Sequence, residues 1–226
     1  MSDKRKSKRK IRKKSIDGMF KFFNDDIRNL YEAIEKADFD NCALLLKKGI
    51  NPNSMYKDFS LLYWIFVFMQ KADSFKIKDK YTGIYKLFLL FNVNINQLIY
   101  YTYVYVNEKI RVANYIPLIS IFSILNLPEY VELLLENPET NINFIDSKGN
   151  TPLIYAASNG CKDIVKLLAS DKRINLLVQN NDYTASDYAR FNKHYDIQKY
   201  LFNIMREEIN KILSKIDGFN FKMPQF

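Results

Sequence analysis

One stretch, from Asp146 to Ala169, constrains the possible folds of this chain more than any other. It reads DSKGNTPLIYAASNGCKDIVKLLA. Thr151 can cap a helix that starts at Pro152, because a proline at the first helical position has no amide left to satisfy. Gly160 ends this helix, and the apolar residues within 164–168 give a second helix its buried face. The stretch therefore predicts a helical hairpin preceded by a tight turn.

Such a hairpin cannot bury its apolar face alone, so similar hairpins must stand next to it. The motif does recur. Thr184 follows Thr151 at a distance of thirty-three residues, and Ile116-Pro117-Leu118 stands thirty-five residues before Thr151-Pro152-Leu153. A decayed copy covers residues 58–96 and a clearer one begins near Leu30. Four copies end on an asparagine, at positions 53, 96, 143 and 175. The spacing predicts five stacked units.

The stretch resembles the ankyrin repeat, whose usual pattern is G-x-T-P-L-H-x-A-A-x-x-G-H-x-x-x-V-x-L-L-L. Ile154 and Cys161 stand where that pattern has its two histidines, and His194 falls where the fifth unit should have its own. The resemblance implies an all-α fold, a solenoid of stacked helix-turn-helix hairpins with short β-hairpin-like turns. The expected ankyrin-repeat domain covers residues 16–216, with units at about 25–53, 58–96, 111–143, 146–175 and 179–202 and then a capping helix.

Two insertions interrupt this pattern. About eleven extra residues near Gln70–Lys80 lengthen either the loop between two helices or the helices themselves. A second added stretch, Gln97–Ile110, alternates Tyr101, Tyr103 and Tyr105 with threonine and valine. Aromatic and β-branched residues at a period of two favour an extended hairpin arm. The alternative is a longer apolar helix that packs on the stack.

The net charge of +9 comes almost entirely from the N-terminus. Residues 1–14 hold nine basic residues and one acid, Asp3, whereas the remainder has 25 basic and 24 acidic residues. We expect residues 1–15 to be a disordered basic tail. Three interpretations stay open: a signal read by a nuclear import receptor, an arm that binds a polyanion such as nucleic acid or acidic membrane, and a solubilising tail. The basic residues are Lys4, Arg5, Lys6, Lys8, Arg9, Lys10, Arg12, Lys13 and Lys14.

The two ends of the repeat array also need covering. Residues 16–24 contain Phe20, Phe22 and Phe23, which we interpret as a cap over the first hairpin, with a docking peptide as the alternative. At the other end, apolar residues recur every three or four positions over 196–216, which predicts a long capping helix. Residues 217–226 are expected to be a loose tail.

The residues needed for catalysis or metal binding are mostly missing. The chain has one histidine, His194, and two cysteines, Cys42 and Cys161, which fall in different units and are not expected to form a disulfide. Six glycines include no phosphate-binding loop. We therefore expect no enzyme activity, metal site, cofactor or small-molecule substrate. No apolar run is long enough for a bilayer, and the cysteines favour an intracellular location, in cytoplasm or nucleus.

What remains is an interaction surface. The resemblance implies that the turns and the ends of the first helices bind a protein partner, and that the chain is a non-enzymatic scaffold, expected to be a monomer. Phe59, Tyr115 and Tyr183 all fall just before the Thr-Pro position and would form a ridge along the concave face. The alternative is that these rings pack into the stack. The candidate positions are Phe59, Phe68, Tyr115, Ile124, Lys148, Asn150, Asn159, Tyr183 and Asn192.

Overall fold

The structure is a computed structural model that describes residues 25–104 and 111–214. Contacts between Cα atoms divide the chain into two compact units, which meet between Asn94 and Ile95. We call these unit 1 and unit 2 and describe each by itself. The predicted basic tail, the phenylalanine cap within 16–24 and the loose tail at 217–226 lie outside the described residues. The expectation of one continuous repeat domain over 16–216 stays a prediction.

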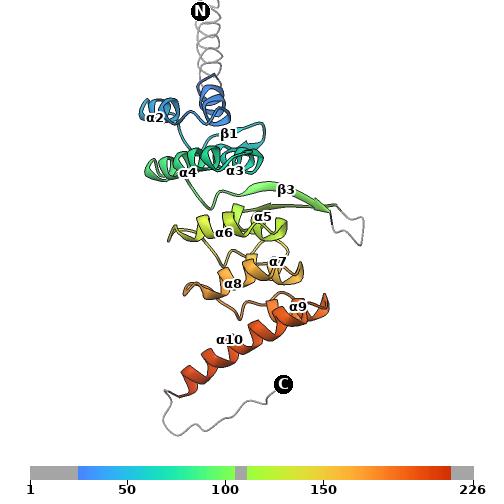
Figure 1. Cartoon of the computed structure of the whole chain (residues 1–226). Coiled ribbons are helices and arrows are strands. Elements are labelled where there is room, and N and C mark those ends of the chain that lie inside the picture. The colour runs from blue at the N-terminus through green and yellow to red at the C-terminus, as the bar shows by residue number, and fades with distance from the viewer. Residues whose placement is uncertain (1–24, 105–110, 215–226) are drawn as a thin grey trace, which may run out of the picture. The chain divides into compact units, whose positions relative to one another are not determined.

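Unit 1 consists of two helix pairs joined by a short β-turn (Figure 1). Leu30, Ile34 and Ile84, all fully buried, belong to its core. Ser60 caps the second pair by accepting a hydrogen bond from the amide of Tyr63 at 3.1 Å. The elements, in order, are a helix over residues 25–35, α2 (Phe39–Lys47), β1 (Met55–Tyr56), β2 (Phe59–Ser60), α3 (Leu61–Lys71) and α4 (Phe75–Leu90).

The first insertion lengthens the helices rather than the loop. Helix α3 runs to Lys71 and α4 starts at Phe75, so three residues separate them. Ser74 begins α4 by accepting a hydrogen bond from the amide of Ile77 at 3.4 Å. Helix α4 is sixteen residues long, against nine for α2 in the preceding pair. The extra residues of Gln70–Lys80 therefore lie at the end of α3 and at the start of α4.

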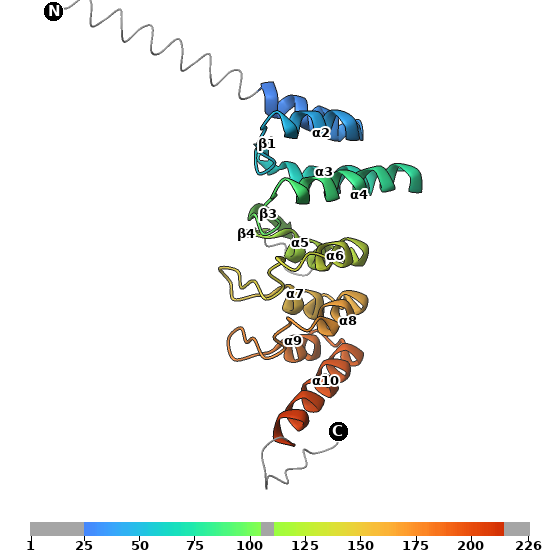
Figure 2. The same ribbon diagram turned by 90° about the vertical axis from the view of Figure 1, so that its left-hand side faces the viewer.

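Unit 2 consists of a β-arm and three helix pairs (Figures 1 and 2). Helix α5 packs on α7 and α7 on α9, while α6 packs on α8 and α8 on α10. Each pair therefore stacks on the next, as the repeat pattern predicts. The pairs are α5 (Leu118–Leu125) with α6 (Pro128–Leu135), α7 (Pro152–Ser158) with α8 (Lys162–Ser170), and α9 (Ala185–Phe191) with α10 (Tyr195–Leu213).

The described part of the second insertion is extended, as the alternation of residue types predicts; residues 105–110 lie outside the described residues. Strands β3 (Ile99–Val104) and β4 (Arg111–Ile116) pair antiparallel, with Ile99 opposite Ile116 and Tyr100 opposite Tyr115. Ile99 and Ile116 are fully buried, so the base of the arm is anchored in the core. The arm is the long green ribbon in Figure 1, and its strands are three times the length of β1 and β2.

The hairpin α7–α8 shows why its sequence matches the repeat pattern so closely. Thr151 caps α7 by accepting from the amide of Ile154 at 3.1 Å, and Pro152 is the first helical residue. Gly160 has φ +74°, and a Cβ there would lie 2.6 Å from the ring of His194, which precedes α10 in the next hairpin. A larger residue at this position would therefore push the last helix pair away.

The recurrent asparagines link consecutive turns. The side-chain amide of Asn143 donates to the carbonyl of Arg173 at 2.7 Å, and its oxygen accepts from the amide of Asn175 at 2.8 Å. Asn96 makes the same pair of bonds with the backbone of Glu139 and Asn141, at 2.7 and 2.8 Å. In unit 1, Asn53 binds the backbone of Asn92 and Asn94 in this way. These bonds satisfy turn backbone groups that would otherwise lack partners.

Candidate partner-binding surface

Two turns, one in each unit, have the same backbone conformation. Lys57 and Asp58 in unit 1 have φ of 49° and 67°, and Asn181 and Asp182 in unit 2 have the same values. Two adjacent left-handed residues are typical of the type I′ turn of a two-residue hairpin. Phe59 and Tyr183 follow these turns, and each directly precedes its helix cap, Ser60 or Thr184. The sequence alignment of Phe59 with Tyr183 is therefore matched by the backbone.

The ring of Phe59 packs inside unit 1. It stacks on Tyr63 with the ring centroids 4.6 Å apart, and its edge meets Trp64 at 5.7 Å. Phe68 stacks on Trp64 at 5.8 Å and lies 5.7 Å from Tyr31. Both phenylalanines are half-buried. We call this group the aromatic cluster; its members are Tyr31, Tyr56, Phe59, Tyr63, Trp64, Phe68 and Tyr81.

Two polar groups of the cluster have hydrogen-bond partners within unit 1. The Trp64 indole donates to the carbonyl of Tyr56 at 2.9 Å, and the Tyr81 hydroxyl donates to the carbonyl of Glu35 at 3.0 Å. The Lys57 ammonium lies over the rings of Tyr31 and Tyr56, at 4.7 and 5.2 Å from their centroids. Burial raises the pKa of Tyr63 and, together with the charge of Glu35, that of Tyr81. Phe59 therefore follows the alternative interpretation, in which the ring packs into the stack, and Phe68 packs in the same cluster.

The ring of Tyr183 in unit 2 is 44% exposed, and that of Phe191, the last residue of α9, is 49% exposed. The two meet edge to face at 4.8 Å. The difference from Phe59 arises at the third helical position. There α3 has Tyr63, which stacks on Phe59, whereas α9 has Asp187, whose carboxylate accepts from the Thr184 amide at 3.0 Å. Without a ring at this position, Tyr183 keeps one side open to solvent.

The turn before α7 contains two of the predicted binding residues, of which Lys148 is exposed and Asn150 is buried. Asp146 is buried and accepts from the amides of Lys148 and Asn150, both at 2.9 Å, and from the hydroxyl of Tyr155. The Asn150 side chain is 9% exposed and accepts from the amide of Asn180 in the next turn at 2.8 Å. Asn150 therefore joins two turns, and we do not include it in the binding surface. Lys148 is exposed at the tip.

The helix ends supply three further predicted positions. Asn159 is exposed at the end of α7. Asn192 is exposed at the end of α9, where its amide donates to the Ser158 hydroxyl at 3.2 Å and to the carbonyl of Tyr188 at 2.9 Å. These bonds bring the ends of α7 and α9 together. Ile124, near the end of α5, is half-buried.

In the structure, the third repeat aligns with the fourth one residue later than the sequence pattern suggests. Pro117 is the residue before α5, so it matches the cap Thr151 rather than Pro152. The left-handed Asn126 matches Gly160 with the same separation of thirty-four residues. The slot of Phe59 and Tyr183 therefore belongs to Ile116, which is fully buried. Tyr115 lies one position earlier, in β4, and its ring is 60% exposed.

The exposed members define one candidate surface on unit 2, which we call the turn face. Phe191 was not among the candidate residues, but its contact with Tyr183 makes it part of the surface. An aromatic residue at the end of the first helix was the signal that could have identified it. The turn face consists of Tyr115, Lys148, Asn159, Tyr183, Phe191 and Asn192.

The two cysteines are free and buried, one in each unit. Burial raises the pKa of the Cys42 thiol to about 12 and that of Cys161 to about 11. Both thiols therefore stay protonated and unreactive near neutral pH. The described residues hold no group of three or more histidine, cysteine, aspartate or glutamate side chains placed to share a metal ion. None of the helices in that part of the chain combines the length and apolar character needed to cross a membrane.

A family model described as ankyrin repeats, in three copies, matches residues 114–212. The three helix pairs of unit 2 are thus ankyrin repeats. The match covers the three helix pairs of unit 2, and the mostly helical structure agrees with an all-α solenoid of helix-turn-helix repeats. The two pairs of unit 1 lie outside the match, so the count of five ankyrin repeats is not confirmed. No curated protein matches the chain.

Proposed function

We propose that this chain is a non-enzymatic interaction module whose turn face binds a protein partner. Ankyrin repeats are in general protein–protein interaction modules, and the family match over residues 114–212 supports that general role here. The specific surface is our proposal. It contains three aromatic rings, one cation and two amide side chains, a composition typical of interface anchors with an adaptable polar surround.

The exposed pair of Tyr183 and Phe191 is the observation that carries this proposal. The two rings are 44% and 49% exposed, and each keeps a fixed orientation through its edge-to-face contact with the other. Tyr188 lies 6.4 Å from Tyr183 and donates through its hydroxyl to the carbonyl of Asn180 at 3.3 Å, which fixes the base of the pair. Rings held in this way lose little conformational entropy on binding.

The test compares partner capture by the full chain and by variants of matched exposure. Tyr183→Ala and Phe191→Ala should each weaken a captured complex by about 1–3 kcal/mol, as measured by calorimetry with the identified partner. Tyr195→Ala is the control, because Tyr195 is an exposed tyrosine on α10 and is not part of the turn face. Equal losses for Tyr195→Ala and Tyr183→Ala would contradict the proposal.

The basic tail supports a second candidate role. Residues 1–14 carry a net charge of +8, whereas the remaining residues carry +1. A segment of this charge attracts polyanions and is typical of sequences read by nuclear import receptors. Deleting residues 1–14 should abolish heparin binding or nuclear accumulation of the full chain and leave its melting temperature unchanged. Unchanged binding and location after the deletion would leave the solubilising interpretation.

A further inference from the structure

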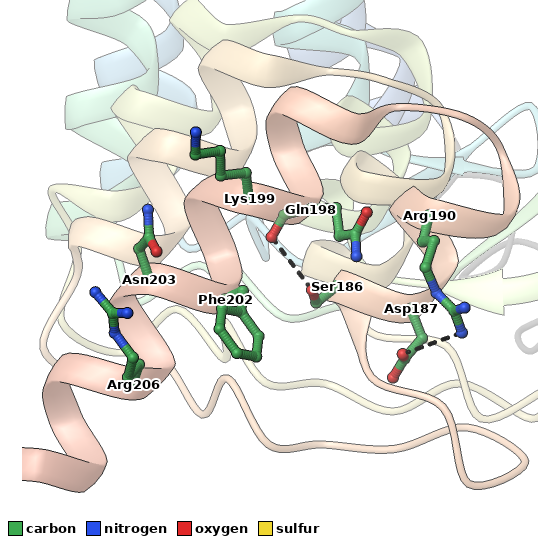
Figure 3. Close-up of a pocket in the computed structure, with 8 residues that line it drawn as sticks. All are labelled: Ser186, Asp187, Arg190, Gln198, Lys199, Phe202, Asn203 and Arg206. Carbon is green, nitrogen blue, oxygen red and sulfur yellow. Dashed lines mark hydrogen bonds and ion pairs between the residues drawn. The ribbon is translucent and has the colours of Figure 1, made fainter. Parts of the chain in front are cut away.

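The end of the last repeat carries a pocket that is separate from the turn face. It lies between α9 and α10, has a volume of about 560 Å³ and is lined by three residues of α9 and five of α10 (Figure 3). This volume is far above the roughly 30 Å³ that one water occupies and falls in the range of ligand-binding sites. A single ion would therefore not fill it.

The pocket lies where a further repeat would pack. With the caps Thr151 and Thr184 aligned, the α9 residues of the pocket replace apolar residues of α7 that are buried between α5 and α9. Ser186, Asp187 and Arg190 replace, in order, Leu153, Ile154 and Ala157. On α10, Gln198 replaces the buried Val165 in the same way. The surface thus keeps the shape of a helix-packing face but changes its chemistry from apolar to polar.

A polar end face would by itself only keep a repeat array soluble. This one carries an excess of positive charge. The Arg190 guanidinium lies 3.8 Å from the Asp187 carboxylate and 5.0 Å from the centre of the Phe191 ring, so this cation has partners. Lys199 and Arg206 have no acidic partner among the residues that the structure describes. Two cations of the pocket therefore remain available to an anionic ligand.

The two cations are arranged for a helical ligand. Lys199 and Arg206 are seven residues apart on α10, which is two turns, or about 10 Å, along one helix face. Phe202 lies between Lys199 and Arg206 in the sequence. Figure 3 shows its ring in the space that separates α10 from Ser186 and Asp187 on α9. A second helix laid in this space would meet charges at two-turn spacing and an apolar ring between them.

We propose that this pocket binds an acidic amphipathic helix of a partner protein, which lies against α9 and α10 as a further repeat would. The acidic side chains of the partner pair with Lys199 and Arg206, and an apolar side chain between them contacts Phe202. The charge of the pocket disfavours the chain's own residues 215–226 as occupant, because that segment has two lysines and one aspartate. The proposal is independent of the turn face.

The experiment uses the full chain and a labelled helical peptide of about 18 residues, with glutamates seven positions apart and leucines between them on one face. Binding is followed by fluorescence anisotropy at physiological salt. The double variant Lys199→Glu and Arg206→Glu should weaken binding at least about tenfold. The control, Lys172→Glu with Lys211→Glu, changes the net charge equally at exposed lysines outside the pocket and should weaken it less than about threefold. Because the basic tail is present in both, its attraction for the peptide cancels.

Two further readouts keep the proposal open to contradiction. A peptide of the same composition with its glutamates spread around the helix should bind about tenfold more weakly than the designed one. Hydrogen exchange should show that the designed peptide protects α10 around Lys199–Arg206. Equal binding of the two peptides, equal loss in both double variants, or protection outside α9 and α10 would overturn the proposal. The proposal would also be overturned if the double variant Lys199→Glu and Arg206→Glu released residues 215–226 from the pocket or dissociated a dimer. Either result would identify another occupant.

Discussion

Phe59 in unit 1 and Tyr183 in unit 2 follow the same kind of turn and precede equivalent helix caps, yet their rings have different surroundings. Phe59 stacks on Tyr63 and meets Trp64, inside a cluster of seven rings. Tyr183 meets Tyr188 and Phe191 by their edges only and stays 44% exposed. The backbone position is the same, so the neighbouring side chains decide whether the ring stabilises the unit or remains available to a partner.

This difference separates two roles that the repeat alignment cannot distinguish. In unit 1 the turn residue Phe59 and the third and fourth residues of α3, Tyr63 and Trp64, are all aromatic, and their rings contact one another. In unit 2 the third helical residue is Asp187, which caps the helix and offers Tyr183 no ring to stack on. Substitutions at equivalent positions should therefore affect stability in unit 1 and binding in unit 2.

The largest effect is expected at the centre of the cluster. Trp64→Ala should lower the free energy of unfolding by about 3–4 kcal/mol, because it removes a ring with four aromatic neighbours and the hydrogen bond to Tyr56. Chemical denaturation followed by circular dichroism measures the loss. A loss below about 1 kcal/mol would show that the cluster is a surface feature and not part of the core.

The alignment of the third repeat has its own test. Ile116→Ala should cost about 3 kcal/mol of stability, because Ile116 is fully buried opposite Ile99. Tyr115→Ala should cost less than about 0.5 kcal/mol, because its ring is 60% exposed. Thermal unfolding of the two variants separates these values. The reverse order would restore the sequence alignment, in which Tyr115 occupies the slot of Phe59 and Tyr183.

Phe59→Ala should have an intermediate effect. The ring is half-buried and stacked on Tyr63, so its removal should cost about 1–2 kcal/mol. Denaturant unfolding that is followed by the fluorescence of Trp64, the one tryptophan of the chain, reports this loss in unit 1. Phe59→Leu is the control for volume and should recover about half of it. An unchanged midpoint for Phe59→Ala would mean that the ring is dispensable and free to bind.

The smallest effect on stability is expected in unit 2. Tyr183→Ala should change the free energy of unfolding by less than about 0.5 kcal/mol, because the ring makes two edge contacts and is otherwise open to solvent. Its effect should appear in binding to the captured partner instead. A destabilisation above about 1 kcal/mol, measured by thermal unfolding, would place the ring in the core and remove it from the turn face.

The hairpin of α7 and α8 could be predicted because it depends on local signals. Thr151 with Pro152, and Gly160 with its left-handed backbone, mark a hairpin wherever they occur. The alternation in Ile99–Val104 indicated the arm in the same way. The direction of the rings could not be predicted, because it depends on which side chains of the following helix contact the turn residue, as Tyr63 and Trp64 of α3 contact Phe59. The shift at Pro117 was also missed, because the Ile-Pro-Leu sequence matches the family pattern while the helix begins one residue later.

The end pocket was missed for a related reason. Its residues follow the helical pattern correctly, so nothing in their periodicity is unusual. The signal was the loss of apolar character at equivalent positions, from Leu153 to Ser186 and from Val165 to Gln198. That comparison needs the repeats aligned by their caps, which the sequence supports well for the fourth and fifth repeats. Even with this alignment, the sequence does not show whether the polar face of α9 and α10 is exposed or covered by another segment.

Labelling of the two buried thiols tests the central comparison most directly, because Cys42 reports on unit 1 and Cys161 on unit 2. Their pKa values, raised to about 12 and about 11, prevent labelling of the folded protein near pH 8, so the rate measures opening of each unit. Phe59→Ala should accelerate labelling of Cys42 by about tenfold, and Tyr183→Ala should leave the rate at Cys161 within about twofold of the original. If Tyr183→Ala accelerates Cys161 as strongly as Phe59→Ala accelerates Cys42, both rings are structural and the account is wrong.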